Sequence, residues 1–194
     1  MKVLVVGIGK SGFEHLKVLK GMKLNNIYGW SLSQRKRDNI SSLNVDIPNY
    51  NFDDLIKKIK PSHVILAVPV DHLTYYTLRL LEFGIKNILI EKPGFIHFKE
   101  ADKVIKEIKK NNANVYVGFN RRFYSSVQSL KKIIKRKNEE IHSIVFEFNE
   151  VFFGKYHTMS QSLNTRNHWL LVNSLHIIDT VFFLSGLPDT KKSS

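Results

Sequence analysis

Short apolar runs alternate with amphipathic stretches through the first 120 residues of the chain. The apolar runs have the length of buried strands and are predicted at residues 3–6, 26–30, 63–68, 87–90 and 114–118. The stretches between them repeat apolar residues at helical spacing and predict helices at 13–20, 52–59, 73–83 and 98–110. Strands and helices in this alternation are typical of an α/β fold, a doubly wound parallel sheet built from βαβ units.

The pattern changes beyond Asn120. Residues 123–137 predict a helix, and residues 143–152 alternate like a strand, with Ile144 and its apolar neighbours on one face. Residues 169–184 predict a strongly apolar helix. A lone strand cannot satisfy its backbone groups on both edges, and a helix that is apolar all round needs burial on every side. The sequence therefore predicts a second, incomplete α+β domain.

The amino-acid composition of the chain excludes several classes of functional site. The chain has no cysteine, which excludes disulfides, thiolate metal sites and cysteine nucleophiles. Its eight histidines form no H-E-x-x-H spacing, so we expect no metal site. No apolar run has the roughly 18–20 residues that a membrane span requires. A strand begins almost at the first residue, which leaves no room for a signal peptide, and we expect a cytoplasmic protein without a membrane partner.

The net charge of +13 allows two interpretations. Lysines alternate with isoleucine at residues 103–110 and 131–137, which is typical of solvated helix faces. A positive field for an anionic substrate or cofactor is the alternative. No helix-turn-helix, zinc finger or aromatic RNA-binding signature accompanies the charge, so we expect no nucleic-acid partner.

A glycine-rich turn follows the first predicted strand and opens the first predicted helix. It reads Gly7-Ile8-Gly9-Lys10-Ser11-Gly12. In this context G-x-G-x-x-G predicts dinucleotide binding, because glycines allow a tight turn and a close approach of the pyrophosphate to the helix N-terminus. A glycine turn with only a structural role is the alternative.

The end of the second predicted strand bears on which dinucleotide binds. NAD-selective sites place Asp or Glu about 20 residues past the glycines, to hold the ribose 2′-hydroxyl. Here Ser31, Ser33 and Arg35 occupy that region, and no carboxylate occurs before Asp38. Hydroxyls followed by cations suit a 2′-phosphate. We predict NADP(H), with NAD(H) possible. A basic loop without this role is the alternative.

A third group of motifs starts at Glu91-Lys92-Pro93, directly after a predicted strand. The others are Ala67-Val68-Pro69 with His72, Gly118-Phe119-Asn120-Arg121-Arg122-Phe123, and His176-Ile177-Ile178-Asp179. With these motifs in this order, the chain resembles the Gfo/Idh/MocA family, the oxidoreductases related to glucose-fructose oxidoreductase and inositol dehydrogenase. In that family the E-K-P motif follows the fifth strand and the peptide before its proline is commonly cis.

The resemblance implies domains and cofactor contacts. Residues 1–119 would be a Rossmann-type NAD(P)-binding domain, and residues 120–194 would begin a C-terminal domain for substrate binding and oligomerisation. Besides the glycine turn and the residues Ser31, Ser33 and Arg35, the implied cofactor-binding residues are Ala67, Pro69, His72, Glu91, Lys92 and Asn120.

The resemblance also assigns two catalytic residues. Lys92 would hydrogen-bond the reacting oxygen and orient the nicotinamide, and His176 would act as acid and base, which suits an imidazole near neutral pH. A surface lysine and a core histidine are the respective alternatives. Arg122, Tyr124 and Asn173 would join them at the substrate, although a polar hinge between domains explains Asn120, Arg122 and Tyr124 equally well.

Two departures from the family pattern bear on activity. Relatives carry a carboxylate four or three residues before the histidine, whereas this chain has Val172 and Asn173 there. Relatives also continue beyond residue 194 into an open-faced sheet. We therefore expect a fragment, a shortened form or a variant completed by a partner, and a homo-oligomer where the sheet is supplied.

The leading hypothesis is an NAD(P)-dependent oxidoreductase that transfers hydride between nicotinamide and a sugar, cyclitol or nucleotide-linked sugar. The stretch around His176 resembles family members of surface-polysaccharide biosynthesis more than inositol dehydrogenases. A catalytically silent dinucleotide-binding remnant or sensor is the alternative.

Overall fold

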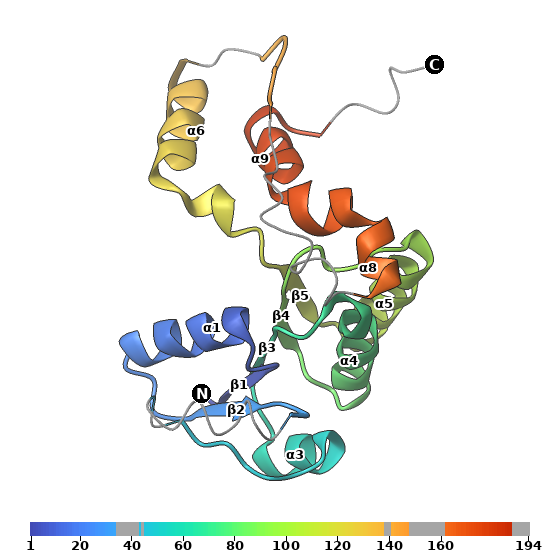
Figure 1. The fold of residues 1–194 in the computed structure, drawn as a ribbon. Helices are drawn as coiled ribbons and strands as arrows, with labels where there is room; N and C mark the ends of the chain where they lie inside the picture. The colour runs from blue at the N-terminus through green and yellow to red at the C-terminus, as the bar shows by residue number, and fades with distance from the viewer. Residues whose placement is uncertain (34–42, 44, 138–140, 148–161, 188–194) are drawn as a thin grey trace. The chain divides into compact units, whose positions relative to one another are not determined.

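The structure is a computed structural model that describes residues 1–33, 43, 45–137, 141–147 and 162–187. The chain forms two compact units, Met1–Gly118 and Phe119–Ser194. Each unit is described by itself below (Figure 1).

Unit 1 is built on a five-stranded parallel sheet with strand order β2-β1-β3-β4-β5. The strands are β1 (Val3–Val6), β2 (Ile27–Trp30), β3 (His63–Leu66), β4 (Asn87–Ile90) and β5 (Asn114–Val117). Their last residues pair with one another across the sheet, so that the carboxyl ends of all five strands are level. This is the Rossmann arrangement that the βαβ alternation predicts.

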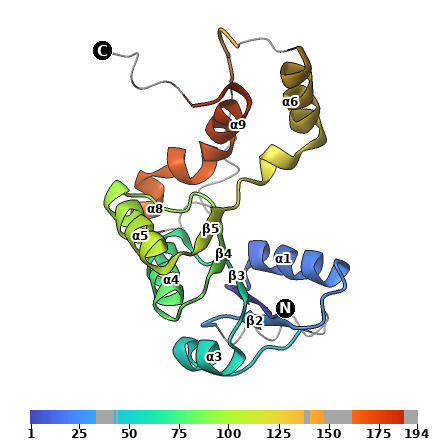
Figure 2. The same cartoon turned by 180° about the vertical axis from the view of Figure 1, so that it is seen from behind.

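Helices cover both faces of the sheet (Figures 1 and 2). They are α1 (Lys10–Gly21), α3 (Phe52–Ile59), α4 (Val70–Glu82) and α5 (Phe98–Asn111). Strand β1 shows why two layers form, because successive side chains of a strand point to opposite faces. Val3 and Val5 pack in one apolar cluster with Leu16 of α1. Leu4 and Val6 pack in a second cluster with residues of the other three helices.

The predicted elements of this unit are all present, with boundaries that shift by up to three residues. Helix α1 begins at Lys10 instead of residue 13, because its first three residues, Lys10-Ser11-Gly12, carry no large apolar side chain. Helix α4 begins at Val70, directly after Pro69, instead of residue 73. Element ends depend on capping geometry more than on periodicity, which is why these positions shift.

The segment between β2 and β3 adds a single β-bridge to the sheet and no further strand among the described residues. Asp46 forms an isolated parallel bridge with Tyr28, and its carbonyl accepts a hydrogen bond from the Gly29 N–H at 2.9 Å. Among the described residues the sheet extends no further on that side. Glu91 therefore follows the fourth described strand, whereas the resemblance implied a fifth.

The elements described in unit 2 are helical, with three α-helices, one 3₁₀ turn and one π-helical turn. They are η2 (Asn120–Phe123), a 3₁₀ turn, α6 (Ser125–Lys137), α8 (Leu163–Asn167), η3 (Leu170–Ser174), a π-helical turn, and α9 (Leu175–Ser185). The single predicted helix over 123–137 is interrupted at Tyr124, which has extended backbone dihedrals. The predicted apolar helix over 169–184 is divided between η3 and α9.

The predicted strand over residues 143–152 is wrong for the part that the structure describes. Residues 143–147 have no strand, and the side chain of Val145 is 96% exposed. A strand is stabilised by pairing, and no described segment pairs with these residues. Residues 148–152, which include Phe148 of the predicted apolar face, lie outside the described residues. Among the described helices, none has both the length and the apolar character needed to cross a membrane.

Candidate functional site

The candidate site of unit 1 lies at the carboxyl edge of the parallel sheet, where each strand passes into its connecting segment. The residue after a strand donates its backbone N–H to the last residue of the neighbouring strand. The four bonds are Gly7 N–H to Trp30 O (2.8 Å), Ala67 N–H to Val6 O (2.8 Å), Glu91 N–H to Leu66 O (2.9 Å) and Gly118 N–H to Ile90 O (2.8 Å). These bonds align the predicted motifs along one edge, where open α/β sheets bind their ligands.

The glycine turn needs its glycines for steric reasons. Gly7 has φ +92°, and a β-carbon on it would lie 2.6 Å from the Ala67 carbonyl carbon and 2.8 Å from the Val68 nitrogen. A β-carbon on Gly12 would overlap the carbonyl oxygen of Gly7 and lie 2.9 Å from its carbonyl carbon. Only glycine fits at these two positions. The turn, helix α1 and the segment after β3 are thus packed backbone against backbone.

The N-terminus of α1 has the features of an anion-binding site. Its N-cap residue, Gly9, has no side chain to cap the first turn, and Phe13 N–H makes the first helical bond to Gly9 O at 2.9 Å. Lys10 and Ser11 are exposed, and the first turn has no acidic residue. The orphan N–H groups and the helix dipole favour a phosphate here. Ile8 is buried in the core, so its side chain packs the turn.

The predicted ribose end of the site is described in part. Ser31 follows β2 and is buried, and its hydroxyl oxygen accepts a hydrogen bond from the Ser33 N–H at 3.3 Å. Ser33 is exposed. Arg35 lies outside the described residues. The two serines thus form a local turn at the carboxyl end of β2, which is the adenosine side of a Rossmann sheet.

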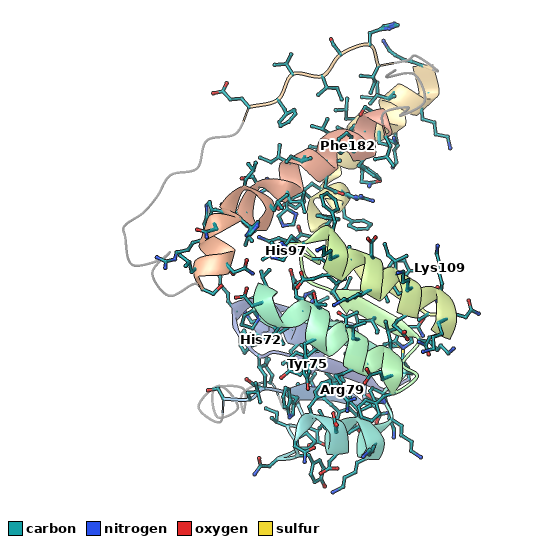
Figure 3. All side chains as sticks on the ribbon, turned by 90° about the vertical axis from the view of Figure 1, so that its right-hand side faces the viewer. His72, Tyr75, Arg79, His97, Lys109 and Phe182 are labelled. Atoms are coloured by element: carbon teal, nitrogen blue, oxygen red, sulfur yellow. The ribbon has the colours of Figure 1, made fainter. Side chains whose placement is uncertain are left out.

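The segment after β3 forms the wall opposite the glycine turn. Ala67 contacts Gly7, as the packing of that turn requires, and Pro69 is the N-cap residue of α4. His72 is exposed on the first turn of α4, and its ring lies 6.4 Å from the ring of Tyr76. Figure 3 shows His72 at the beginning of this helix, followed along it by Tyr75 and Arg79.

The E-K-P segment forms a tight turn at the end of β4. The peptide between Lys92 and Pro93 is cis, as the resemblance implied, and Gly94 N–H donates to Glu91 O at 3.1 Å. Lys92 is half-buried. The Glu91 carboxylate is 2.7 Å from Nε2 of His15, a residue of α1.

His15 is a site residue that the sequence reasoning missed. It lies on α1 three residues after Gly12, beside the buried Leu16, and so borders the face of the helix that packs on the sheet. A histidine at this position of an otherwise apolar stripe was the only available signal. Its partner Glu91 is 76 residues away in the sequence, which no periodicity could identify.

The environment of Glu91 favours its charged form. Burial is the largest influence and works to raise the pKa of its carboxyl group. The hydrogen bond and attraction from His15, together with the backbone N–H and charge of Lys92, outweigh burial and hold the pKa below its ordinary value of 4.5. Glu91 is therefore an ionised carboxylate that His15 and the Lys92 backbone N–H hold in place.

In unit 2 the predicted residue Arg122 forms a two-pronged ion pair with Asp179 of α9. Arg122 Nε donates to Asp179 Oδ2 at 2.7 Å, and Nη2 donates to Oδ1. The guanidinium carbon lies 5.6 Å from the ring of Phe119 and 5.3 Å from that of Phe183. The hydrogen bonds to Asp179 raise the pKa of Arg122 further above its ordinary value. The side chain of Asp179 is buried, so this pair fixes η2 against α9.

His176 lies on the first turn of α9, one helical turn before Asp179. Its ring contacts the edge of Phe119, with centroids 6.2 Å apart, and its Nδ1 atom is buried. Val172 is buried and Asn173 exposed on the preceding π-helical turn. Neither residue can ionise, so the two positions three and four residues before His176 carry no carboxylate.

The predicted residues thus fall into two groups. The glycine turn, Ser31, Ala67, Glu91 and Lys92 share one sheet edge of unit 1. Asn120, Arg122, Tyr124, Asn173 and His176 belong to unit 2, where Phe119 contacts both Arg122 and His176 and where Asn120 and Tyr124 are exposed. Within the described ranges, no three His, Asp or Glu side chains gather as a metal site would require.

Comparison with known proteins agrees with this fold. Residues 1–119 match the model of the Gfo/Idh/MocA oxidoreductase family with an NAD-binding Rossmann fold. A myo-inositol 2-dehydrogenase of Thermotoga maritima is 25% identical over 137 residues, which are 70% of this chain and 41% of that protein.

Two solved structures cover nearly the whole chain at low sequence identity. The scyllo-inositol dehydrogenase of Lactobacillus casei with bound NAD(H) and scyllo-inositol is 22% identical, with a TM-score of 0.76, over 96% of this chain and 56% of that one. The WlbA dehydrogenase of Chromobacterium violaceum, in complex with NADH and UDP-GlcNAcA, is 16% identical, with a TM-score of 0.79, over 96% and 55%. The chain therefore spans little more than half the length of these proteins.

Proposed function

Because the chain belongs to the Gfo/Idh/MocA oxidoreductase family, we propose that it binds NADP(H) and takes part in hydride transfer to or from a sugar, cyclitol or nucleotide-linked sugar. The observation that carries this proposal is the common sheet edge of the glycine turn and the Glu91-Lys92-Pro93 turn. A dinucleotide bound at that edge has its pyrophosphate at the N-terminus of α1 and extends along the strand ends.

The chain's own residues fit the dinucleotide. The backbone at Gly7 and Gly12 leaves no room for a β-carbon, which keeps the turn tight and packed against α1, while Gly9 exposes bare backbone to a pyrophosphate and the first turn of α1 offers N–H groups. Ala67, Pro69 and His72 line the segment after β3, and Asn120 follows β5. Ser31, Ser33 and Arg35 favour a 2′-phosphate over a free ribose hydroxyl, since no carboxylate occupies that loop before Asp38.

Two side chains, Lys92 and His176, act on the reacting oxygen of the substrate. When bound, the nicotinamide accepts or delivers the hydride. Lys92 donates a hydrogen bond to the substrate oxygen, which stabilises negative charge on it. His176 takes the hydroxyl proton during oxidation or returns it during reduction. Arg122, Tyr124 and Asn173 complete the substrate side, and residues 120–194 are the beginning of the domain that carries it.

The substrate class is supported by the ligands bound in two structurally similar proteins, a cyclitol in the Lactobacillus casei enzyme and a nucleotide-linked sugar in the Chromobacterium violaceum enzyme. A second function, dinucleotide binding without turnover, is favoured by Val172 and Asn173. At these positions the chain has no carboxylate to orient the His176 ring.

Titration calorimetry at low salt with NADPH and NADH, followed by nicotinamide absorbance with candidate keto-sugars, tests both functions. We expect tighter binding of NADPH, and a loss of turnover of about 100-fold or more in His176→Ala. His142→Ala is the matched control, because His142 is an exposed histidine of the same unit. Binding without turnover selects the second function, and turnover that survives His176→Ala removes the catalytic role of His176. If the folded protein binds neither dinucleotide, both functions fail.

A further inference from the structure

The contact between His15 and Glu91 joins the two turns of the candidate cofactor site. His15 belongs to α1, the helix that the glycine turn opens, and Glu91 begins the turn that carries Lys92. The His15 Nε2 and Glu91 Oε1 atoms are 2.7 Å apart. Both side chains are largely shielded, with 27% and 24% of their surface exposed. The contact therefore links the pyrophosphate side of the site to the E-K-P side.

This pair differs from most ion pairs of unit 1. Of the five described there, three join residues three positions apart on one helix, as Lys17 and Glu14 do. Exposed pairs of that kind contribute little. His15 and Glu91 instead connect a helix to a strand end. A shielded carboxylate is costly unless donors satisfy it, and Glu91 has two, the His15 ring and the Lys92 backbone N–H.

The Glu91 carboxylate also lies close to the neighbouring strand end. A β-carbon on Gly118, the residue after β5, would lie 3.9 Å from the Glu91 Cα and 4.0 Å from its Oε2. The carboxylate thus lies near the end of β5 and contacts His15 of α1. Loss of the His15 ring would leave it with one donor and open the contact on the α1 side.

The strand order shows which half of a dinucleotide this contact serves. The glycine turn follows β1, and the adenosine half of a Rossmann ligand extends toward the end of β2. The other half must extend over the ends of β3 and β4, since the strand order is β2-β1-β3-β4-β5. Glu91 follows β4, on the nicotinamide side of the turn.

We infer that His15 is a positioning residue, which holds the Glu91-Lys92-Pro93 turn at a fixed place relative to α1 and so supports the nicotinamide half of the bound dinucleotide. This inference rests on the proposed function. It assigns no proton transfer to His15, which acts only through Glu91.

Two ligands separate this role from a general structural one. NADPH contains both halves of the dinucleotide, whereas 2′-phospho-ADP-ribose has the adenosine half and the pyrophosphate but no nicotinamide. In the full chain with His15→Ala, we expect NADPH to bind about tenfold more weakly, the size of one hydrogen bond to a charged group. The affinity for 2′-phospho-ADP-ribose should stay within about twofold. Titration calorimetry measures both.

Two further variants complete the test. His15→Gln keeps an amide donor within reach of Glu91, so it should recover most of the affinity for NADPH. Lys17→Ala, on the same helix, removes a side chain that pairs with Glu14 and lies over the Phe13 ring of α1 itself, so it should bind both ligands as the unchanged protein does. Thermal unfolding reports the fold of each variant.

Three outcomes overturn the inference. His15→Ala can bind NADPH as tightly as the unchanged protein, it can lose both ligands equally, or His15→Gln can bind NADPH no better than His15→Ala while folded. All three leave the proposed function intact, because the unchanged protein still binds NADPH. If the unchanged protein binds neither ligand, the proposed function itself fails and the inference fails with it.

Discussion

Different kinds of contact stabilise the interior of each unit. Unit 1 contains the buried apolar side chains of the described chain with one exception, Val172 of unit 2. Its strands are level, hydrogen-bonded and covered on both faces. Unit 2 instead has the ion pair of Arg122 with Asp179 between two aromatic rings. Unit 1 gains its stability from buried area, and unit 2 depends on a few polar and aromatic contacts.

The contrast is sharpest at α9. Within the described residues, Asp179 is the one residue of this apolar helix that is buried. Phe182 of the same helix is 40% exposed (Figure 3). In unit 1, Leu16, Leu66 and Leu80 are completely buried. An apolar sequence therefore does not by itself produce burial, since a helix needs a partner surface. In unit 1, helices and sheet supply such surfaces to each other on both faces of the sheet.

The largest expected effect comes from breaking the packed turn of unit 1. Gly12→Val would drive side-chain atoms into the Gly7 carbonyl group, so we expect a loss of about 3 kcal/mol in the free energy of unfolding. Affinity for either dinucleotide should fall with it. Urea denaturation and calorimetry measure the two losses.

Gly21→Ala is the matched control on the same helix. A β-carbon on Gly21 meets nothing within 4 Å, so this variant should be unchanged or more stable by up to about 1 kcal/mol. Equal losses in Gly12→Val and Gly21→Ala would show that the turn is not tightly packed.

A smaller effect is expected from breaking the ion pair of unit 2. Arg122→Ala leaves the buried Asp179 carboxylate with lost hydrogen bonds, at a cost of about 2 kcal/mol. Because unit 1 does not depend on this pair, hydrogen exchange followed by mass spectrometry should accelerate in peptides from residues 162–187 and stay unchanged in β1 and β3. Arg166→Ala, at an exposed arginine of α8, is the control. Acceleration in both units alike would show that the two units do not depend on separate contacts for their stability.

The smallest effect is the pH dependence of the Glu91 contact. The pKa of Glu91 is lowered in the folded protein, so its contribution is present above the ordinary value of 4.5 and lost as the pH falls through the folded value. We expect Glu91→Gln to be about 1 kcal/mol less stable than the unchanged protein at pH 7. The difference should shrink below pH 4.5. Urea denaturation across this range measures it, and a difference that grows in acid would refute the assignment.

Much of unit 1 could be predicted from the sequence. Strand residues such as Val3–Val6 and the glycines of the first turn carry local signals, since an apolar run and a G-x-G-x-x-G spacing depend only on neighbours in the chain. The predicted strand over residues 143–152 failed where it is described, because a strand requires a partner that alternation does not reveal. The pair of Arg122 and Asp179 gave no signal, although both residues belong to recognised motifs.

What the sequence by itself determined is therefore the order of the elements, the position of the glycine turn and the E-K-P turn, and with them the family. Only the tertiary structure decided that His15 meets Glu91, that Arg122 is engaged by Asp179, and that the strand ends are level. The physical reason is distance along the chain. Backbone sterics and periodicity act between near neighbours, whereas a contact between residues 57 or 76 positions apart exists only after the sheet and helices have packed.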